Sequence, residues 1–177
     1  KQYYPNFSIL EKNTIVADTL KKALKNKNIF LIAEQETGSP AIFKTFSPVL
    51  KDYVYNGGNV IFCGSASRQT NWMFNTGLFH GNYVRNVNGQ QLKLLNKQHP
   101  ITSNLDTVLF GTDATYCCRL TDPNIVHLVS DTSKNDVLAY REYGNGKVFF
   151  IAFDYTSYDS NGAKMISNIF RWINSGL

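Results

Sequence analysis

One short segment of the sequence holds the residue types that nucleophilic chemistry needs. Val60-Ile61-Phe62 is an apolar run typical of a buried parallel strand, and Cys63 and Ser65 follow it among small residues. Enzymes built from alternating helices and strands hold a nucleophile at such a strand-to-turn junction. We therefore treat Cys63 and Ser65 as candidate nucleophiles, with backbone amides after Gly64 as an oxyanion hole. The competing interpretation is a buried apolar cysteine and a turn serine.

A general base for this chemistry is hard to find in the sequence. A thiol must lose its proton before it attacks, so Cys63 needs a base or a positive field nearby. The chain has 3 histidines, which are His80, His99 and His127, and none occurs after His127. We expect His99, which precedes Pro100, to lie in a turn, and His127 to be a hydrogen-bonded strand residue.

The possible metal ligands do not have the spacing of a metal site. No pair follows a pattern such as His-x-x-x-His, and the adjacent Cys117 and Cys118 differ from a zinc knuckle. Besides the histidines, the possible ligands are Asp113, Asp154 and Asp159. The sequence predicts no metal site, no disulfide framework and, since no phosphate-binding glycine-rich motif occurs, no cofactor.

Polar loops follow the predicted parallel strands, where proteins of this class bind ligands. These loops are Glu34–Ser39, Gly64–Asn71 and Asp154–Asp159. Polar groups next to tyrosines suit a sugar, a peptide or a loop of a partner protein. The candidate ligand-binding residues are Ser65, Ser67, Arg68, Asn71, Asp154, Tyr155 and Tyr158, and Asp154 is also a candidate catalytic residue.

Hydrophobic periodicity indicates the elements that position these loops. Helices are expected at 13–26, 41–55, 71–76 and 160–174, and strands at 29–33, 60–63, 107–110, 115–120 and 125–130. Asn88-Gly89 predicts a hairpin between 84–87 and 91–95, and Gly144-Asn145-Gly146 predicts one between 137–143 and 147–153. Helix and strand alternate in the first half, as in a parallel sheet with right-handed crossovers.

The predicted fold class is α/β, a three-layer flavodoxin-like sandwich with a mostly parallel central sheet and antiparallel additions in the second half. The 177 residues suit a single domain spanning 1–177, and the chain opens on Lys1 without an initiator methionine. We therefore expect a piece excised from a longer protein, secreted or on the cell surface. Its partners would be neighbouring domains of the same polypeptide, a carbohydrate or another protein.

Charge and hydropathy exclude two broad classes of partner. The formal net charge is +5, but no arginine-rich stripe with interleaved aromatic residues accompanies it, so nucleic-acid binding is not predicted. No apolar run reaches 18 residues, so no membrane span is predicted.

Four segments, taken in order and spacing, carry a family resemblance. They are 50–62, which contains Gly57-Gly58, then His99-Pro100-Ile101-Thr102, then 144–154, and last 166–173. On these segments the chain resembles class I glutamine amidotransferase-like domains. In particular it is similar to the divergent forms fused within secreted multidomain proteins, including bacterial peptidases. The resemblance covers the chain from about Asn28 onward and implies the flavodoxin-like fold.

The chain departs from the catalytic pattern of that family at two places. A competent member has a cysteine at a nucleophile elbow and a His-x-Glu pair near its C-terminus. Cys63 lies near the elbow position, but no glycine stands two residues before it, and Asp154-Tyr155-Thr156 occupies the place of the histidine. The resemblance therefore implies the fold and not the amidotransferase activity.

Three hypotheses follow from the sequence. The first is a non-catalytic amidotransferase-like accessory domain with an interaction or structural role. The second is a cysteine-dependent hydrolase or amidotransferase-like enzyme that uses Cys63. The third is a sugar-binding protein of the trehalose-utilisation type, which shares the Gly-Gly strand and the His-Pro-Ile-Thr turn, although Cys63 and Gly64 stand where that group usually has a histidine.

Overall fold

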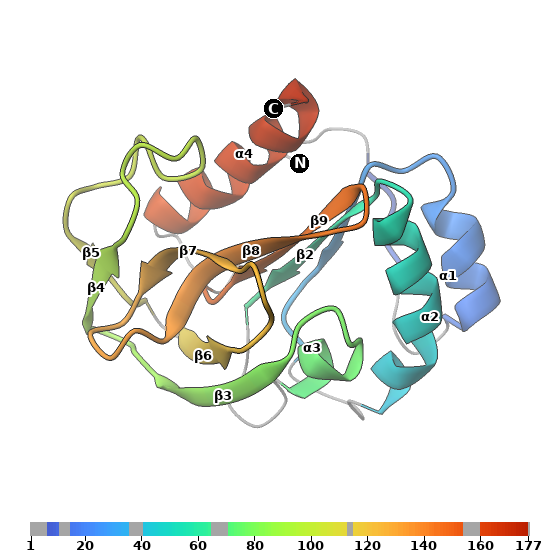
Figure 1. Cartoon of the computed structure of the whole chain (residues 1–177), viewed down its shortest axis with the longest axis horizontal. Coiled ribbons are helices and arrows are strands. Elements are labelled where there is room, and N and C mark those ends of the chain that lie inside the picture. Colours follow the sequence, from blue (N-terminus) through green and yellow to red (C-terminus); the bar gives the residue numbers. More distant parts are fainter. Residues whose placement is uncertain are drawn as a thin grey trace.

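The computed structural model describes residues 7–10, 15–35, 41–64, 71–112, 115–153 and 160–176. Its first half alternates helix and strand, and its second half consists mainly of strands and ends in a long helix (Figure 1). The elements are α1 (Ala17–Leu24), β1 (Ile29–Ile32), α2 (Ile42–Tyr55), β2 (Asn59–Cys63), α3 (Asn71–Asn75), β3 (Gly81–Asn86), β4 (Gln91–Leu94), β5 (Leu109–Phe110), β6 (Tyr116–Leu120), β7 (Val126–Ser130), β8 (Asp136–Tyr143), β9 (Gly146–Ile151) and α4 (Ser160–Ser175).

Strands from both ends of the chain form the parallel part of the sheet. β1 pairs with β2, and β2 pairs with β9 with Asn59 opposite Lys147. Every residue of β2 is buried, which explains why its sequence is an unbroken apolar run. β9, late in the chain, therefore pairs with β2 of the first half, and this pairing joins the two halves of the domain.

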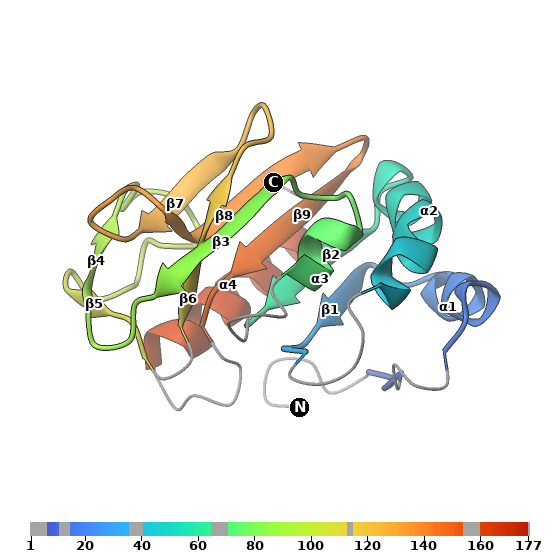
Figure 2. The ribbon, with the colours of Figure 1, turned by 90° about the horizontal axis from the view of Figure 1, so that it is seen from below.

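The antiparallel part continues from β9. β8 pairs with β9, then β7 with β8, and β4 lies between β7 and the short strand β5. β3 pairs with β6, and β6 touches β8 at one position, Cys118 opposite Asp136. Seen from below, β3 and β6 lie on the same side of β8 as α3 (Figure 2).

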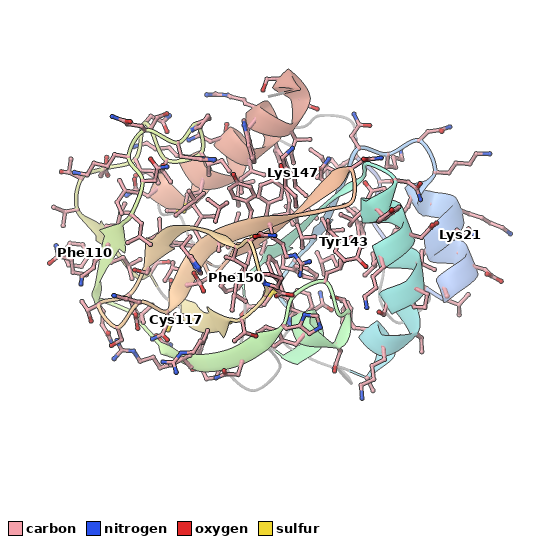
Figure 3. The ribbon with its side chains drawn as sticks, viewed as in Figure 1. Lys21, Phe110, Cys117, Tyr143, Lys147 and Phe150 are labelled. Atoms are coloured by element: carbon pink, nitrogen blue, oxygen red, sulfur yellow. The ribbon has the colours of Figure 1, made fainter. Side chains whose placement is uncertain are left out.

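Helices cover both faces of the sheet, as the alternation of side chains along the strands requires. Phe62 of β2 packs against Trp72 of α3, with ring centroids 5.3 Å apart. Phe149 of β9 points to the other face and packs against Trp172 of α4, with ring centroids 6.0 Å apart. Its neighbour Phe150 is 0% exposed and lies in the interior, whereas Lys21 and Phe110 project from opposite ends of the molecule (Figure 3). The three-layer α/β fold class predicted from the sequence is confirmed.

Two glycine turns that are far apart in the sequence pack against each other. The amide of Asn145 in the β8–β9 turn donates to the carbonyl oxygen of Tyr55 at 3.0 Å. A methyl group on Gly146 would lie 2.0 Å from the oxygen of Gly58, and one on Gly58 would meet the ring of Tyr53. These glycines allow the end of α2, the start of β2 and the start of β9 to approach closely.

The prediction of a hairpin around Asn88-Gly89 is wrong, although the tight turn itself forms. Gln90 donates to the oxygen of Val87 at 3.0 Å, but β3 pairs with β6, and β4 pairs with β5 and β7. The segment around Gly111 lies against the turn: Gly89 donates to the oxygen of Gly111 at 2.8 Å, and Gly111 donates to that of Gln90 at 2.9 Å. Strands from elsewhere therefore take the hydrogen bonds that a local hairpin would have used.

We predict that Gly146→Ala destabilises the domain by at least about 2 kcal/mol, because the added methyl group meets backbone atoms that cannot rotate away. The matched control is Gly89→Ala, where the φ of +68° strains the backbone but nothing lies within 4 Å. We expect that control to lose about 1 kcal/mol. Urea unfolding of both variants measures the difference, and equal losses would contradict the close approach of the two turns.

Candidate functional site

The carboxyl ends of β1, β2 and β9 meet at one edge of the sheet, which is where ligands bind in open α/β folds. Most of the loop residues proposed from the sequence lie outside the described part of the chain. These are Ser65, Ser67, Arg68, Asp154, Tyr155, Tyr158 and Asp159, and Asp113 also lies outside it. Asn71 begins α3, but its side chain is not described. The described edge therefore consists of Cys63, Gly64 and their neighbours.

Cys63 is enclosed in the sheet and has no exposed surface. It lies opposite Ile151 in the β2–β9 register, and its side chain is 0% exposed. The thiol donates to the carbonyl oxygen of Phe153 over 3.7 Å. Gly64 then turns the chain with a φ of +79°, and its amide donates to the oxygen of Ile151 at 2.9 Å. In this state Cys63 cannot reach a substrate, and the Gly64 amide is not available to an oxyanion.

An aromatic cluster packs on Phe62, the residue before Cys63, on the face of the sheet that α2 and α3 cover. Trp72 in α3 is 1% exposed and packs between Phe43 of α2, at 5.1 Å, and Phe62 of β2, at 5.3 Å. The indole Nε1 of Trp72 is buried and has no hydrogen-bond partner. Sequence reasoning did not single out Trp72. The feature of the sequence that could have identified it is a large aromatic residue with a polar N–H group directly after a polar loop.

His80 forms a cluster with two charged side chains. Its Nδ1 lies 2.6 Å from Oδ1 of Asp122, and its backbone amide donates to Oδ2 of the same carboxylate, also at 2.6 Å. Arg141 of β8 forms an ion pair with Asp122 and lies over the ring of Tyr143 at 5.4 Å. The Asp122 side chain is 1% exposed while that of His80 is 67% exposed, so a buried carboxylate orients a surface imidazole.

His127 lies in β7, as predicted, and contacts a second buried carboxylate. Its Nδ1 is 2.5 Å from Oδ1 of Asp136, whose Oδ2 accepts the amide of Leu120 at 3.3 Å. Burial raises the pKa of Asp136, although its hydrogen bond with His127 acts in the opposite direction. Burial also raises the pKa of the Cys118 thiol well above its usual value, with the charge of Asp136 adding to the effect. Cys118 is therefore inert as a nucleophile at neutral pH.

His99 lies in a turn, as predicted, and belongs to the layer under α4. The amide of Ile101 donates to Nδ1 of His99 at 3.2 Å, so the proton of the neutral ring is on Nε2, which lies 3.2 Å from the hydroxyl of Tyr140. The imidazole packs edge-on against Trp172 at 5.1 Å. Burial lowers the pKa of His99, so the ring is neutral at pH 7. Each of the three histidines thus has a partner in the antiparallel part of the fold.

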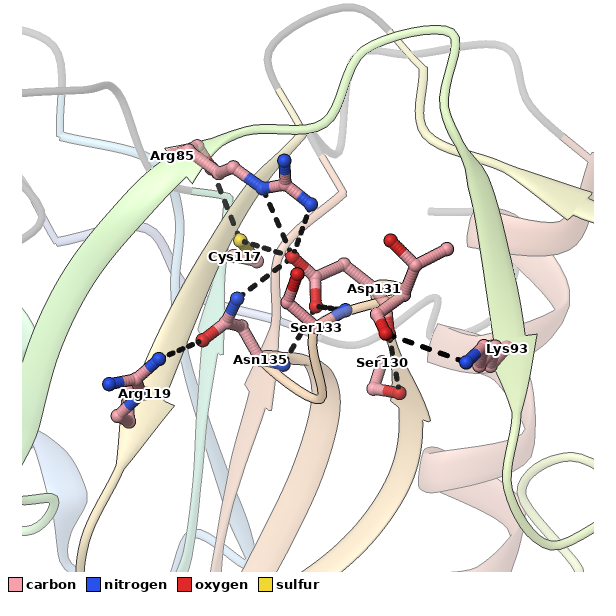
Figure 4. A network of polar contacts seen from close by, with 9 residues as sticks. Arg85, Lys93, Cys117, Arg119, Ser130, Asp131, Ser133 and Asn135 are labelled. Atoms are coloured by element: carbon pink, nitrogen blue, oxygen red, sulfur yellow. Dashed lines mark hydrogen bonds and ion pairs between the residues drawn. The ribbon is translucent and has the colours of Figure 1, made fainter.

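Asp131 organises the turn between β7 and β8 (Figure 4). Its Oδ1 accepts the amides of Ser133 and Asn135, each at 2.8 Å. Its Oδ2 accepts from the side chains of Asn135 and Arg85, both at 2.8 Å, and from the Cys117 thiol at 3.7 Å. Burial raises the pKa of Asp131, but these hydrogen bonds outweigh it and hold the pKa below its usual value. The carboxylate is ionised and its acceptor sites are occupied within the protein, which is a structural role.

Within the described ranges, no three His, Cys, Asp or Glu side chains gather as metal ligands. No helix in that same part of the chain is long and apolar enough to cross a membrane.

Comparison with known proteins gives a family and a fold. The chain matches the ThuA family, described as "Trehalose utilisation", over residues 10–173. No curated protein sequence matches it. Similar solved structures include two cytoplasmic proteins of Salmonella typhimurium. The first has a TM-score of 0.65 and 13% sequence identity, and the match covers 88% of this chain and 74% of that one. The second has a TM-score of 0.64 and 16% sequence identity, and the match covers 89% of this chain and 75% of that one.

A third similar structure is a protein from Bacteroides uniformis described as ThuA-like, with a TM-score of 0.59 and 17% identity, covering 86% of this chain and 71% of that one. At such identities these structures show the fold alone. Together with the family match they confirm an amidotransferase-like, flavodoxin-like fold, which the sequence resemblance implied. The family description also agrees with the third hypothesis drawn from the sequence.

We predict that Asp131→Ala lowers the free energy of unfolding by about 3 kcal/mol, because buried donors that Asp131 now accepts lose their partner. Asp131→Asn keeps the shape and removes the charge, so we expect a smaller loss. Chemical denaturation at pH 7 measures both, with the exposed Asp18→Asn as the control. A loss from Asp131→Ala no larger than that from Asp18→Asn would contradict the organising role.

The pH dependence of stability provides a separate test of Asp131. Because its folded-state pKa is lowered, its ionised form stabilises the fold above the ordinary carboxyl pKa of about 3.9. This contribution disappears as the pH falls through the lowered pKa. We expect the stability of Asp131→Asn to fall less steeply between about pH 5 and pH 2 than that of the wild type. Parallel pH profiles for the two proteins would show that Asp131 does not titrate as described.

Proposed function

The chain belongs to the ThuA family, and we propose that it acts by binding, without cysteine chemistry, as an interaction or structural domain of a larger protein. The exported location of that larger protein is part of the proposal and rests on the secreted multidomain proteins that the sequence resembles. The neighbouring domains of the same polypeptide are its proposed partners.

The burial of Cys63 carries this proposal. A nucleophilic cysteine is partly exposed and lies in an electropositive environment that stabilises the thiolate. Cys63 instead has no exposed surface, and its thiol hydrogen-bonds to a backbone carbonyl, which is a poor environment for a negative sulfur. The described histidines have their partners at Asp122, Asp136 and Tyr140. This arrangement favours the accessory domain over the cysteine-dependent enzyme.

The family description favours a carbohydrate as the ligand. We propose that it binds at the edge where the parallel strands end, since this is the usual ligand position in such sheets. The loop residues expected there, among them Ser65, Arg68 and Tyr155, offer the hydroxyl, guanidinium and aromatic groups that suit a polyhydroxylated ligand. Their roles are proposals drawn from the sequence and the topology of the strands.

We predict that Cys63 resists alkylation in the native protein. Iodoacetamide at pH 7, followed by mass spectrometry, should modify it at least 100-fold more slowly than in urea-denatured protein, because the buried thiol is reached only through unfolding. Cys63→Ala should also leave ligand binding unchanged. Fast, selective labelling of Cys63 in the folded protein would instead support the cysteine-dependent enzyme.

Binding of sugars can be measured directly. Titration calorimetry against a panel that includes trehalose and glucose should detect a saturable complex. Arg68→Ala should weaken it about fivefold, the effect of losing one hydrogen bond of about 1 kcal/mol. Lys21→Ala is the control, since Lys21 is an exposed residue of α1, at the end of the molecule opposite Phe110 (Figure 3). Equal affinities for the wild type and Arg68→Ala would remove Arg68 from the site, and no binding to any sugar would refute the carbohydrate proposal.

A further inference from the structure

We propose that Trp72 is a ligand-binding residue whose indole N–H donates a hydrogen bond to a hydroxyl oxygen of a neutral, polyhydroxylated ligand. The inference rests on the proposed function, because it places the ligand at the same edge of the sheet. It goes beyond it by naming the donor and the chemistry of the atom that the donor contacts.

The unpaired state of the indole nitrogen is the first observation. Trp72 is 1% exposed, and its Nε1 is the buried side-chain nitrogen or oxygen without a hydrogen-bond partner in the described part of the chain. An indole nitrogen can only donate, and folded proteins pair nearly all such buried groups. A donor that has lost water and gained no partner is unfavourable, so this one is available to an acceptor that the chain itself does not supply.

The position of Trp72 is the second observation. Its ring packs on Phe62, the residue before the last of β2, and on Phe43, the second residue of α2. Trp72 therefore packs against the start of α2 and the carboxyl-terminal half of β2. The carboxyl ends of the parallel strands are where the topology of the fold favours ligand binding.

The surroundings of the indole indicate a neutral acceptor. Phe43 and Phe62 pack on the ring, and Phe79 packs on Phe62 at 6.2 Å. A carboxylate or phosphate placed among these rings would lose its hydration without a counter-charge from them. A sugar hydroxyl carries no charge and brings an apolar carbon skeleton that can lie against an aromatic ring. The group that accepts from the indole is therefore an uncharged hydroxyl oxygen, as a saccharide or polyol offers.

A trapped water molecule explains the unpaired donor less well. A buried water needs two to four polar partners, and the two rings that pack on Trp72, those of Phe43 and Phe62, offer none. A ligand hydroxyl needs only the indole at this point, because the rest of the ligand makes its contacts elsewhere. Since Trp72 is almost fully buried, binding must displace the groups that now cover the indole, and we expect a local rearrangement at this edge.

The indole N–H can be observed directly by nitrogen-15 NMR. The chain has 2 tryptophans, so the protein shows two indole signals, and Trp172→Phe assigns them. Trehalose, glucose and a polyol such as sorbitol are titrated in turn, while calorimetry measures binding independently. We expect the Trp72 signal to shift with the same saturation as the calorimetric curve, and its hydrogen exchange to slow at least tenfold. The Trp172 signal should not follow that curve.

Variants separate the hydrogen bond from the shape of the ring. Replacing Trp72 by β-(3-benzothienyl)alanine exchanges N–H for sulfur at nearly constant volume, and should weaken binding at least fivefold without unfolding the protein. Trp72→Phe should weaken it further, and Trp172→Phe should not weaken it. If a sugar binds but the Trp72 signal and the sulfur variant show no effect, the role of Trp72 is refuted and the proposed function stands. If no sugar or polyol binds, both the role of Trp72 and the carbohydrate proposal are refuted.

Discussion

The parallel pairing of β2 with β9 is the contact on which the rest of the structure depends. It joins β2, which starts at Asn59 in the first half of the chain, to β9, which starts 87 residues later at Gly146. The pairing requires that backbone meet backbone where α2 ends, because Gly146 lies against the oxygens of Gly58 and Val54. Glycine is needed there, since any side chain would keep the two segments apart.

This pairing also separates two kinds of environment. On the parallel side, strands covered by helices on both faces make an apolar interior, and Cys63 is part of it. On the antiparallel side, buried aspartates bind histidine and arginine side chains: Asp122 with His80 and Arg141, and Asp136 with His127. Among the described residues, these buried carboxylates and their partners lie in the antiparallel part of the fold, whereas Cys63 ends a parallel strand.

That separation explains why the family fold is compatible with a binding function in this chain. Cysteine chemistry requires a thiolate, a base and an oxyanion hole in one place. Here the thiol contacts a backbone carbonyl, the Gly64 amide is used by Ile151, and the histidines are held by other partners. Among the described residues, the buried side-chain donor without a partner is instead the indole N–H of Trp72, which suits recognition of a ligand oxygen.

Local sequence patterns were sufficient to predict most of the helices and strands and the fold class. Apolar runs and helical periodicity placed β1, β2, α2 and α4 within a few residues, and Gly144-Asn145-Gly146 identified the β8–β9 hairpin. These features depend on neighbouring residues, so local patterns carry them. The tertiary structure alone decided that β3 and β4 part after Asn88-Gly89, that Cys63 is enclosed, and that Asp122, Asp131 and Asp136 are buried acceptors. Each of these outcomes depends on segments that are distant in the sequence. Strands and side chains from those segments supply the hydrogen-bond partners and bury the residues, so no local pattern contains the information.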